Sequence, residues 1–262
     1  MIDHYINLER FYDTQGLQSH REEILLHMTE NKTAYRRCYH CLGALGALEN
    51  DIHELIFTEE VAAKLSKRAK GIIGRELHRA GNEAGNVTHR FLSAVSCQGR
   101  LTLWDTVSSG FHKVYELQDT FGLAHELLVP ILAAATAQGY NVVACPSPLA
   151  PDRLEHLLIP ALGLAFVTSN KEQPYSGSRP YRRLHLDAIY STREEYIKHR
   201  ARFAKKVSAA LLDGGLEALK SAKAAHDTLE NLYNPYVDFS GVYAEADALA
   251  AQLFPGCLIA NQ

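Results

Sequence analysis

Two distant stretches of this chain are versions of one segment. The stretch INLERFYDT at residues 6–14 matches LHLDAIYST at residues 184–192, and a long helical pattern follows each of them. Solenoid repeats recur about every 20 to 50 residues, so the much longer spacing here indicates the duplication of a whole domain. The match continues at a nearly constant spacing in the pairs Tyr12 and Tyr190, His20 and His199, Leu42 and Leu219, Ala47 and Ala224, Ile52 and Leu229, and Leu55 and Leu232.

The segment between the two copies, residues 89–180, occurs once. We therefore expect residues 1–80 to be the helical tail of a first unit and residues 89–262 to be a complete unit with its own helical hairpin. Apolar residues at helical spacing predict two helices within residues 17–57 and a third over 58–73. The pattern predicts that the hairpin returns at 193–212 and 216–233, with a last helix at 242–254. The Gly- and Asn-rich residues 81–86 are the predicted linker.

Short apolar runs alternate with a helical pattern between residues 89 and 180. Strands are predicted at 91–96, 112–117, 141–145 and 164–168, and a helix at 124–138 stops before Gly139. The last two runs are almost continuously apolar, as in strands buried on both faces. Strand, helix and strand with short connections predict an α/β fold with a mostly parallel sheet flanked by helices, followed by the repeated α-helical hairpin.

The bulk composition excludes several classes of function. A net charge of −3 gives no electrostatic argument for nucleic-acid binding. The most apolar window, residues 127–137, is too short to cross a bilayer and contains Pro130. The polar N-terminal residues do not predict a signal peptide. Five cysteines do not make an even disulfide framework. We expect a cytoplasmic protein that binds neither nucleic acid nor membrane.

Four segments carry a resemblance to a known family. They are His89-x-Phe91-x-Ser93-Ala94-Val95-Ser96-x-x-Gly99, Gln138–Val142, the apolar-Ile-Pro segment Leu158–Leu162, and the Ala/Lys-rich Ala222–Asp227. In this order they resemble an uncharacterised family of bacterial tandem P-loop ATPase-like proteins, over nearly the whole chain. The resemblance implies a P-loop NTPase-like core followed by a helical hairpin in each unit, and it implies an ATPase that uses ATP and Mg²⁺.

The chain departs from that family at the phosphate-binding loop. Where the family has a G-x-x-x-x-G-K-[ST] loop, this chain has Asp119 and Ala124 in place of the two glycines, His125 in place of the lysine, and Glu126 in place of the hydroxyl residue. Gly122, at a variable position, keeps the family's glycine. Thr168 stands where the family tends to have the Walker-B aspartate. These positions are the candidate site, as a degenerate phosphate loop that we expect not to function.

Electrostatics also argues against nucleotide binding at this loop. A helix N-terminus attracts anions by about 1 kcal/mol, but Glu126 already places a carboxylate in the first helical turn. Two unit charges about 4 Å apart interact by about 4 kcal/mol at an effective dielectric near 20. Repulsion between a polyphosphate and the carboxylates of Asp119 and Glu126 would therefore exceed the attraction of the helix.

Three other groups have both a chemical and a structural interpretation. Cys38 and Cys41 have the spacing of a metal or redox pair, although no second pair lies nearby in the sequence, so packing is favoured. The residues His226, Asp227 and Glu230 form an acid/base cluster or a solvated contact. The third group is a basic and aromatic patch that suits an anion or RNA, or that anchors a solvated loop: Tyr175, Arg179, Tyr181, Arg182 and Arg183.

The sequence is compatible with three functions. The first is a non-catalytic scaffold or regulatory protein with a P-loop fold and no cofactor. The second is an ATP-binding protein or ATPase with ATP and Mg²⁺. The third is an enzyme that reuses the pocket, with His125 as the base and Glu126 or Asp119 orienting it. The apolar stripe at residues 42–55 lacks a sheet of its own, so we also expect a homo-oligomer or a protein partner that supplies the missing first core.

Overall fold

The chain forms two compact units, one of residues 1–35 with 221–262 and the other of residues 36–220. The computed structural model describes residues 5–81, 83–190 and 195–254. Cys257, residue 82 of the predicted linker, and residues 191–194, where the second repeated segment ends and a predicted helix begins, lie outside the described residues. We call residues 36–220 the α/β unit and the other unit the helical unit.

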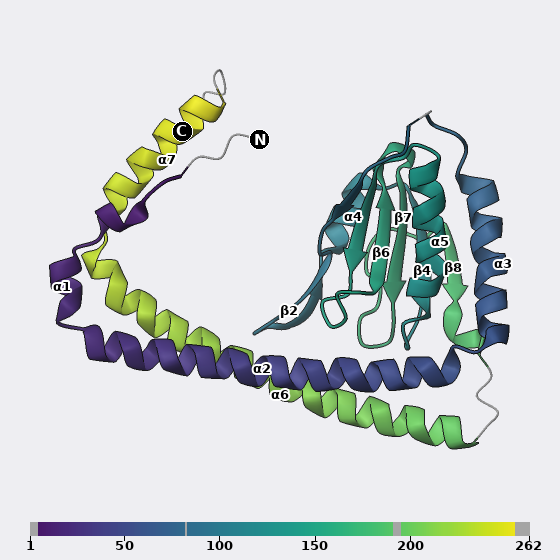
Figure 1. Ribbon diagram of the computed structural model, residues 1–262, viewed down its shortest axis with the longest axis horizontal. Helices are drawn as coiled ribbons and strands as arrows, with labels where there is room; N and C mark the ends of the chain where they lie inside the picture. The colour runs from purple at the N-terminus through teal and green to yellow at the C-terminus, as the bar shows by residue number, and fades with distance from the viewer. Residues whose placement is uncertain (1–4, 82, 191–194, 255–262) are drawn as a thin grey trace. The chain divides into compact units, whose positions relative to one another are not determined.

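Six strands form one mixed sheet in the α/β unit, part of which is labelled in Figure 1. Five of them point the same way, and β6 is antiparallel to both of its neighbours. Only η2 (Pro160–Leu162) and Gly163 join β6 to β7, and a connection this short cannot make a parallel crossover. The predicted α/β class with a mostly parallel sheet is confirmed. The order is β1 (Val87–His89), β5 (Val142–Pro146), β6 (Leu154–Ile159), β7 (Leu164–Ser169), β4 (Lys113–Gln118) and β8 (Arg182–His185).

Helices cover both faces of the sheet. Alternation along β4 sends Tyr115 and Leu117 to one face and Val114 to the other. The first face packs against α5 (Leu123–Ala137) and α3 (Glu59–Glu76), which form the larger apolar core. The second face packs against α4 (Trp104–Gly110). The short helix η3 (Leu186–Ala188) follows β8 and buries Leu186 in the larger core.

The predicted strands and the central helix are present, with shifts of one or two residues at their ends. They are β4, β5 and β7 of the sheet, β2 (Ser93–Ser96), and α5, which ends before Gly139 with φ +92°. Strand β2 lies outside the sheet and forms an antiparallel hairpin with β3 (Gly99–Thr102). The sequence pattern does not predict β1, β3, β6 or β8.

The prediction of helical hairpins is wrong, because each one is a single long helix. Helix α2 (Arg21–Ile56) replaces the two helices predicted within residues 17–57, and α6 (Glu195–Tyr233) replaces those predicted at 193–212 and 216–233. Interior glycines suggest breaks but cost only about 1 kcal/mol each. A Cβ atom at Gly215 would lie 3.4 Å from Leu42, so this glycine lies where the two helices pack.

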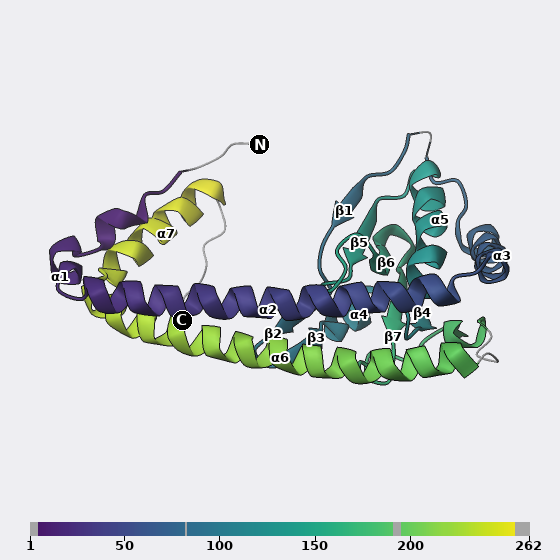
Figure 2. The ribbon, with the colours of Figure 1, turned by 60° about the horizontal axis from the view of Figure 1, so that its bottom comes forward.

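Within the α/β unit the two long helices run antiparallel, because Arg200 of α6 pairs with Asp51 of α2 and Gly215 of α6 lies beside Leu42 of α2 (Figure 2). Residue numbers therefore rise along one helix as they fall along the other. Within the helical unit the Asn31 amide of α2 donates to the Ala222 carbonyl of α6 at 2.8 Å. This pairing joins segments that are far apart in the sequence.

The helical unit combines both ends of the described chain. It contains η1 (Leu8–Phe11), α1 (Thr14–Gln18), η4 (Asn234–Tyr236) and α7 (Phe239–Leu253), the last close to the predicted helix 242–254. The Asp13 N–H donates to the Tyr236 carbonyl, and the Asp238 N–H donates to the Phe11 carbonyl, both at 2.8 Å. Backbone hydrogen bonds thus connect η1 to the start of α7.

Helix α3 and the end of α2 belong to the core of the α/β unit. Ile52, Ile56, Val61 and Leu65 are buried in the same apolar cluster as Tyr115. The apolar stripe at the end of α2 is therefore covered within its own unit. No helix in the described part of the chain is long and apolar enough to cross a membrane.

Candidate functional site

A cavity of about 360 Å³ lies within the α/β unit, where β4 and β7 end. Its walls come from the turn between β4 and α5, the loop between β5 and β6, the starts of α5 and β6, the end of β7, and parts of α2 and β3. Ligands of open α/β sheets commonly bind outside the carboxyl ends of the strands. The charged, polar and turn residues that line it include Glu49, Asn50, Arg100, Asp119, Gly122, Ala124, His125, Arg153, Glu155 and Thr168.

Asp119 fills its own turn with a carboxylate. Its Oδ1 accepts from the Phe121 N–H at 3.1 Å, and its Oδ2 accepts from the Ala124 N–H at 2.7 Å. Gly122 makes this turn with φ +79°, a conformation that glycine adopts without strain. The side chain is buried, and this burial raises the pKa of Asp119 to about 6, against the lowering effect of the loop N–H groups. The carboxylate therefore takes the backbone donors that a phosphate would need.

A second carboxylate takes the next donor of the turn. Asp187, in η3, accepts from the Thr120 N–H at 2.9 Å and from the Thr120 hydroxyl at 2.6 Å. The charge of Asp187 also contributes to the raised pKa of Asp119. Two protein carboxylates thus accept the N–H groups of residues 120, 121 and 124.

His125 and Glu126 point to structural partners. The Leu154 N–H donates to Nδ1 of His125 at 2.9 Å, so a neutral ring carries its proton on Nε2. Glu126 does not line the cavity, and its Oε1 lies 3.3 Å from Nε2 of His53. Nδ1 of His53 lies 3.1 Å from the Phe121 carbonyl. Burial, and then the charge of Arg153, lower the pKa of His53, against the contacts with Phe121 and Glu126.

A buried polar cluster stands beside the turn, around Glu155. Its carboxylate accepts from the Ser93 hydroxyl and lies 3.3 Å from Nε2 of His156 and 3.6 Å from Nη2 of Arg100. Burial opposes the charge of Glu155, but the contacts with His156, Ser93 and Arg100 outweigh it and lower the pKa. The Thr168 hydroxyl donates to the Glu155 carbonyl, so it is already engaged.

Helix α2 adds two polar residues to the lining of the cavity. Asn50 accepts from Nη2 of Arg153 at 2.8 Å. Glu49 has a raised pKa because burial disfavours its charge, an effect that the nearby Arg100 opposes and Glu155 reinforces. The cavity therefore combines two arginines with several carboxyl groups, which suits a small polar ligand better than a polyanion.

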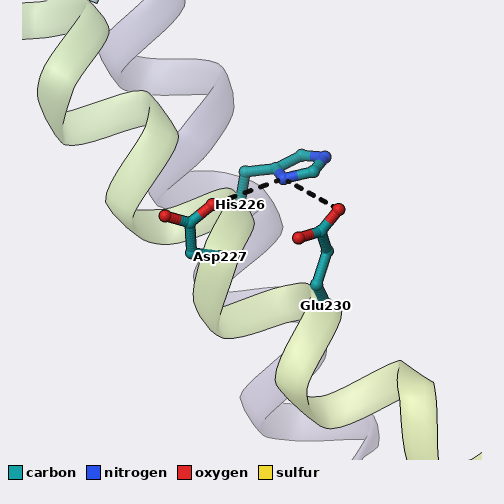
Figure 3. Close-up of side chains that lie close together, drawn as sticks. All are labelled: His226, Asp227 and Glu230. Carbon is teal, nitrogen blue, oxygen red and sulfur yellow. Dashed lines mark ion pairs between the residues drawn. The ribbon is translucent and has the colours of Figure 1, made fainter.

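One group within the described residues has the ligand atoms of a metal site, and it is the predicted cluster on α6 (Figure 3). Nδ1 of His226 lies 3.7 Å from Oε1 of Glu230 and 4.0 Å from Oδ1 of Asp227. All three ligands come from one helix, and Nζ of Lys223 lies 2.7 Å from both oxygens of Asp227. A divalent ion would have to displace this ammonium group, so the geometry gives little support to a metal centre.

In the cysteine pair, Cys38 is a packed side chain of α2. Cys38 is buried, and burial, followed by the nearby Cys41, raises the pKa of its thiol. A raised pKa lowers the fraction of reactive thiolate. In the predicted basic patch, Nε of Arg183 donates to the buried Glu116 carboxylate at 2.6 Å, so this arginine serves a structural ion pair.

The structure brings most of the sequence-predicted site residues together. Asp119, Gly122, Ala124 and His125 line the cavity with Thr168, whereas Glu126 faces His53 outside it. Sequence reasoning missed the contributions of Arg100, Arg153 and Glu155. It also missed Asp187, although this residue lies in the repeated segment, and it gave no site role to Glu49, Asn50 and His53.

The chain matches no protein-family model, no curated protein and no solved structure.

Proposed function

We propose that the core has a P-loop-like fold and that the chain acts as a non-catalytic scaffold or regulatory protein. The arrangement around β4 supports this: the strand runs into a tight turn and then into α5, and the parallel strand β7 lies beside it. In P-loop proteins this turn binds phosphate, and the adjacent strand can carry a metal-binding carboxylate. Here Thr168 stands at that position on β7 and donates its hydroxyl to a backbone carbonyl.

The carboxylate of Asp119 is the observation that carries the proposal. A phosphate loop binds its ligand because successive backbone N–H groups converge on one anion. In this chain the Asp119 carboxylate already accepts two of these N–H groups, and Asp187 accepts another. A nucleotide would have to displace both carboxylates without the help of a lysine. The turn thus serves the fold instead of a ligand.

Titration calorimetry with ATP and Mg²⁺ tests the proposal. We expect no measurable binding to the unmodified chain and no ATP hydrolysis. His125→Lys alone should stay inactive, because the carboxylates of Asp119 and Glu126 remain. The combined change Asp119→Gly, Ala124→Gly, His125→Lys and Glu126→Ser restores the family's loop and is the positive comparison. A micromolar dissociation constant for the unmodified chain, abolished by His125→Ala, would overturn the proposal.

The ATP-binding alternative has one supporting observation, which is the cavity itself. Arg100 and Arg153 line it beside the turn and provide positive charge in place of the lost lysine. The same calorimetric titration decides between this alternative and the scaffold. The alternative in which His125 is a catalytic base has less support, because its Nδ1 accepts from a backbone N–H and Glu126 contacts His53 instead.

A scaffold acts through partners, so the proposal includes a protein partner. The candidates are a second copy of this chain and a protein that supplies a second core. The described residues of the helical unit expose several large apolar side chains, among them Leu8, Phe239, Tyr243 and Leu253. Exposed apolar side chains that gather on one face are typical of protein interaction sites.

A further inference from the structure

The helical unit repeats the elements that cover the α/β core. In the α/β unit the short helix η3 precedes α6, and α3 follows α2. In the helical unit η1 precedes α1 and α2, and α7 follows α6. Leu8 of η1 and Leu186 of η3 are counterparts, because the spacing of the sequence repeat separates them. The helical unit therefore has both covering elements, but among its described residues it has no sheet for them to cover.

Equivalent apolar residues are buried in one unit and exposed in the other. Leu186 is 0% exposed within the core, whereas Leu8 is 51% exposed. The helices that follow the two long helices show the same contrast, because Val61 in the first turn of α3 is 3% exposed and Phe239 in the first turn of α7 is 42% exposed.

The pattern continues along the two helices. Leu65, one turn further along α3, is 1% exposed, whereas Tyr243, one turn further along α7, is 65% exposed. In α3 the apolar side chains meet α5 and the sheet. Apolar residues recur at helical spacing along α7 at 239, 243, 246, 250 and 253, and all of these except residue 250 are exposed, so the exposed apolar side chains form a stripe along the helix.

The polar cluster of Figure 3 extends this equivalence. In the sequence repeat, His226, Asp227 and Glu230 are the counterparts of Glu49, Asn50 and His53. In the α/β unit the first two of these earlier residues line the cavity, and His53 contacts Phe121 and Glu126 at the β4–α5 turn. The cluster on α6 thus corresponds to the part of α2 that contacts the β4–α5 turn in the α/β unit.

We propose that this face of the helical unit binds a second α/β core, built like residues 87–190. The docking face consists of Leu8, His226, Glu230, Phe239, Tyr243 and Leu253. The inference rests on the proposed function as an interaction protein and names the partner. A second copy of this chain fits less well, because its own α3 and η3 already cover the equivalent surface of its core. The partner is an α/β core whose covering helix is missing.

An in-register duplication of the core tests this inference on the full chain. Residues 83–183 are added ahead of Ile6, so that a second core leads into η1 as the resident core leads into η3. Tyr243→Cys on the docking face is compared with Ala248→Cys, an exposed position of α7 outside the apolar stripe. Alkylation is followed at each site by peptide mass spectrometry. We expect labelling at 243 to slow at least about tenfold in the extended chain, with no change at 248.

Three results would overturn the inference. The first is an unchanged labelling rate at 243. The second is a hydrogen-exchange result in which the core peptides, which come from both copies of the core, split into a protected and an unprotected population. The resident core folds beside α3, so an added core that bound α7 should be protected as well. The third is a dimer of the unmodified chain that by itself protects position 243, since the occupant would then be a second copy. The ATP titration of the unmodified chain decides the proposed function separately.

Discussion

Asp119→Ala is expected to lower the free energy of unfolding by about 3 kcal/mol at pH 7. The substitution leaves the N–H groups of Phe121 and Ala124 without their acceptor, and each buried donor without a partner costs about 1 to 3 kcal/mol. Asp152→Ala is the matched control, because Asp152 lines the same cavity but is exposed. Its effect should stay within about 0.5 kcal/mol. Urea unfolding of the three proteins measures the difference.

The pH dependence of this stability cost distinguishes the loss of the Asp119 carboxyl group from a general loss of side-chain packing. The pKa of Asp119 is about 6 in the folded protein, above its ordinary value of 3.8. A raised folded pKa contributes stability that is complete below pH 3.8 and is lost as the pH rises through about 6. The cost of Asp119→Ala should therefore be larger at pH 4 than at pH 7. An equal cost at both pH values would contradict this account of the turn.

Glu76→Ala is expected to destabilise the α/β unit by about 3 kcal/mol, because it removes the acceptor of a charged network. This residue ends α3, is buried, and accepts from Nζ of Lys113 at 2.6 Å, from Nε of Arg75 at 3.1 Å and from the Tyr115 hydroxyl. Glu59→Ala, at the exposed start of the same helix, should cost at most about 1 kcal/mol. Thermal and urea unfolding measure both variants.

The stability cost of Glu76→Ala changes with pH in the opposite direction to the cost of Asp119→Ala. Burial opposes the charge of Glu76, but Lys113, Tyr115 and Arg75 outweigh it and lower the pKa below 4.5. A lowered folded pKa contributes stability that is present above pH 4.5 and is lost as the pH falls through the folded value. The cost of Glu76→Ala should therefore decrease in acid. Tyr115→Phe, which removes one of the three donors, should cost about 1 kcal/mol. A cost for Glu76→Ala no greater than this would contradict the network.

The sequence predicted those parts of the fold that depend on apolar periodicity. Strands β5 and β7 read as continuous apolar runs because both faces of each strand are covered. Strands β1 and β8 have no such pattern, because VTH and RRLH lie at the edges of the sheet and are largely exposed. Glu155 and His156 interrupt the apolar run of β6, so its sequence does not look like a buried strand. His156 is nevertheless buried, and its Nδ1 accepts from the Thr168 N–H. Edge strands and buried polar residues therefore escape a periodicity argument.

The candidate site was predictable in position but not in detail. The family resemblance located the turn at residues 119–126, and four of its five named positions line one cavity. Nothing in the local pattern shows that Asp119 folds back onto the N–H groups of its own turn. The approach of Arg100, Glu155 and Asp187 depends on tertiary pairing between distant segments. A residue list from one loop cannot contain such neighbours.

The pairing of η1 with α7 has a consequence for the order of folding during synthesis. Residues 36–220 contain every strand of the sheet and both apolar clusters, so this part can close once residue 220 has left the ribosome. The helical unit needs residues from both sides of that segment, because Tyr12 bridges to Val237. The entropic cost of bringing these two ends of the chain together is smaller once the intervening chain is compact. The N-terminal segment should therefore complete the helical unit only after residue 237 has also left the ribosome.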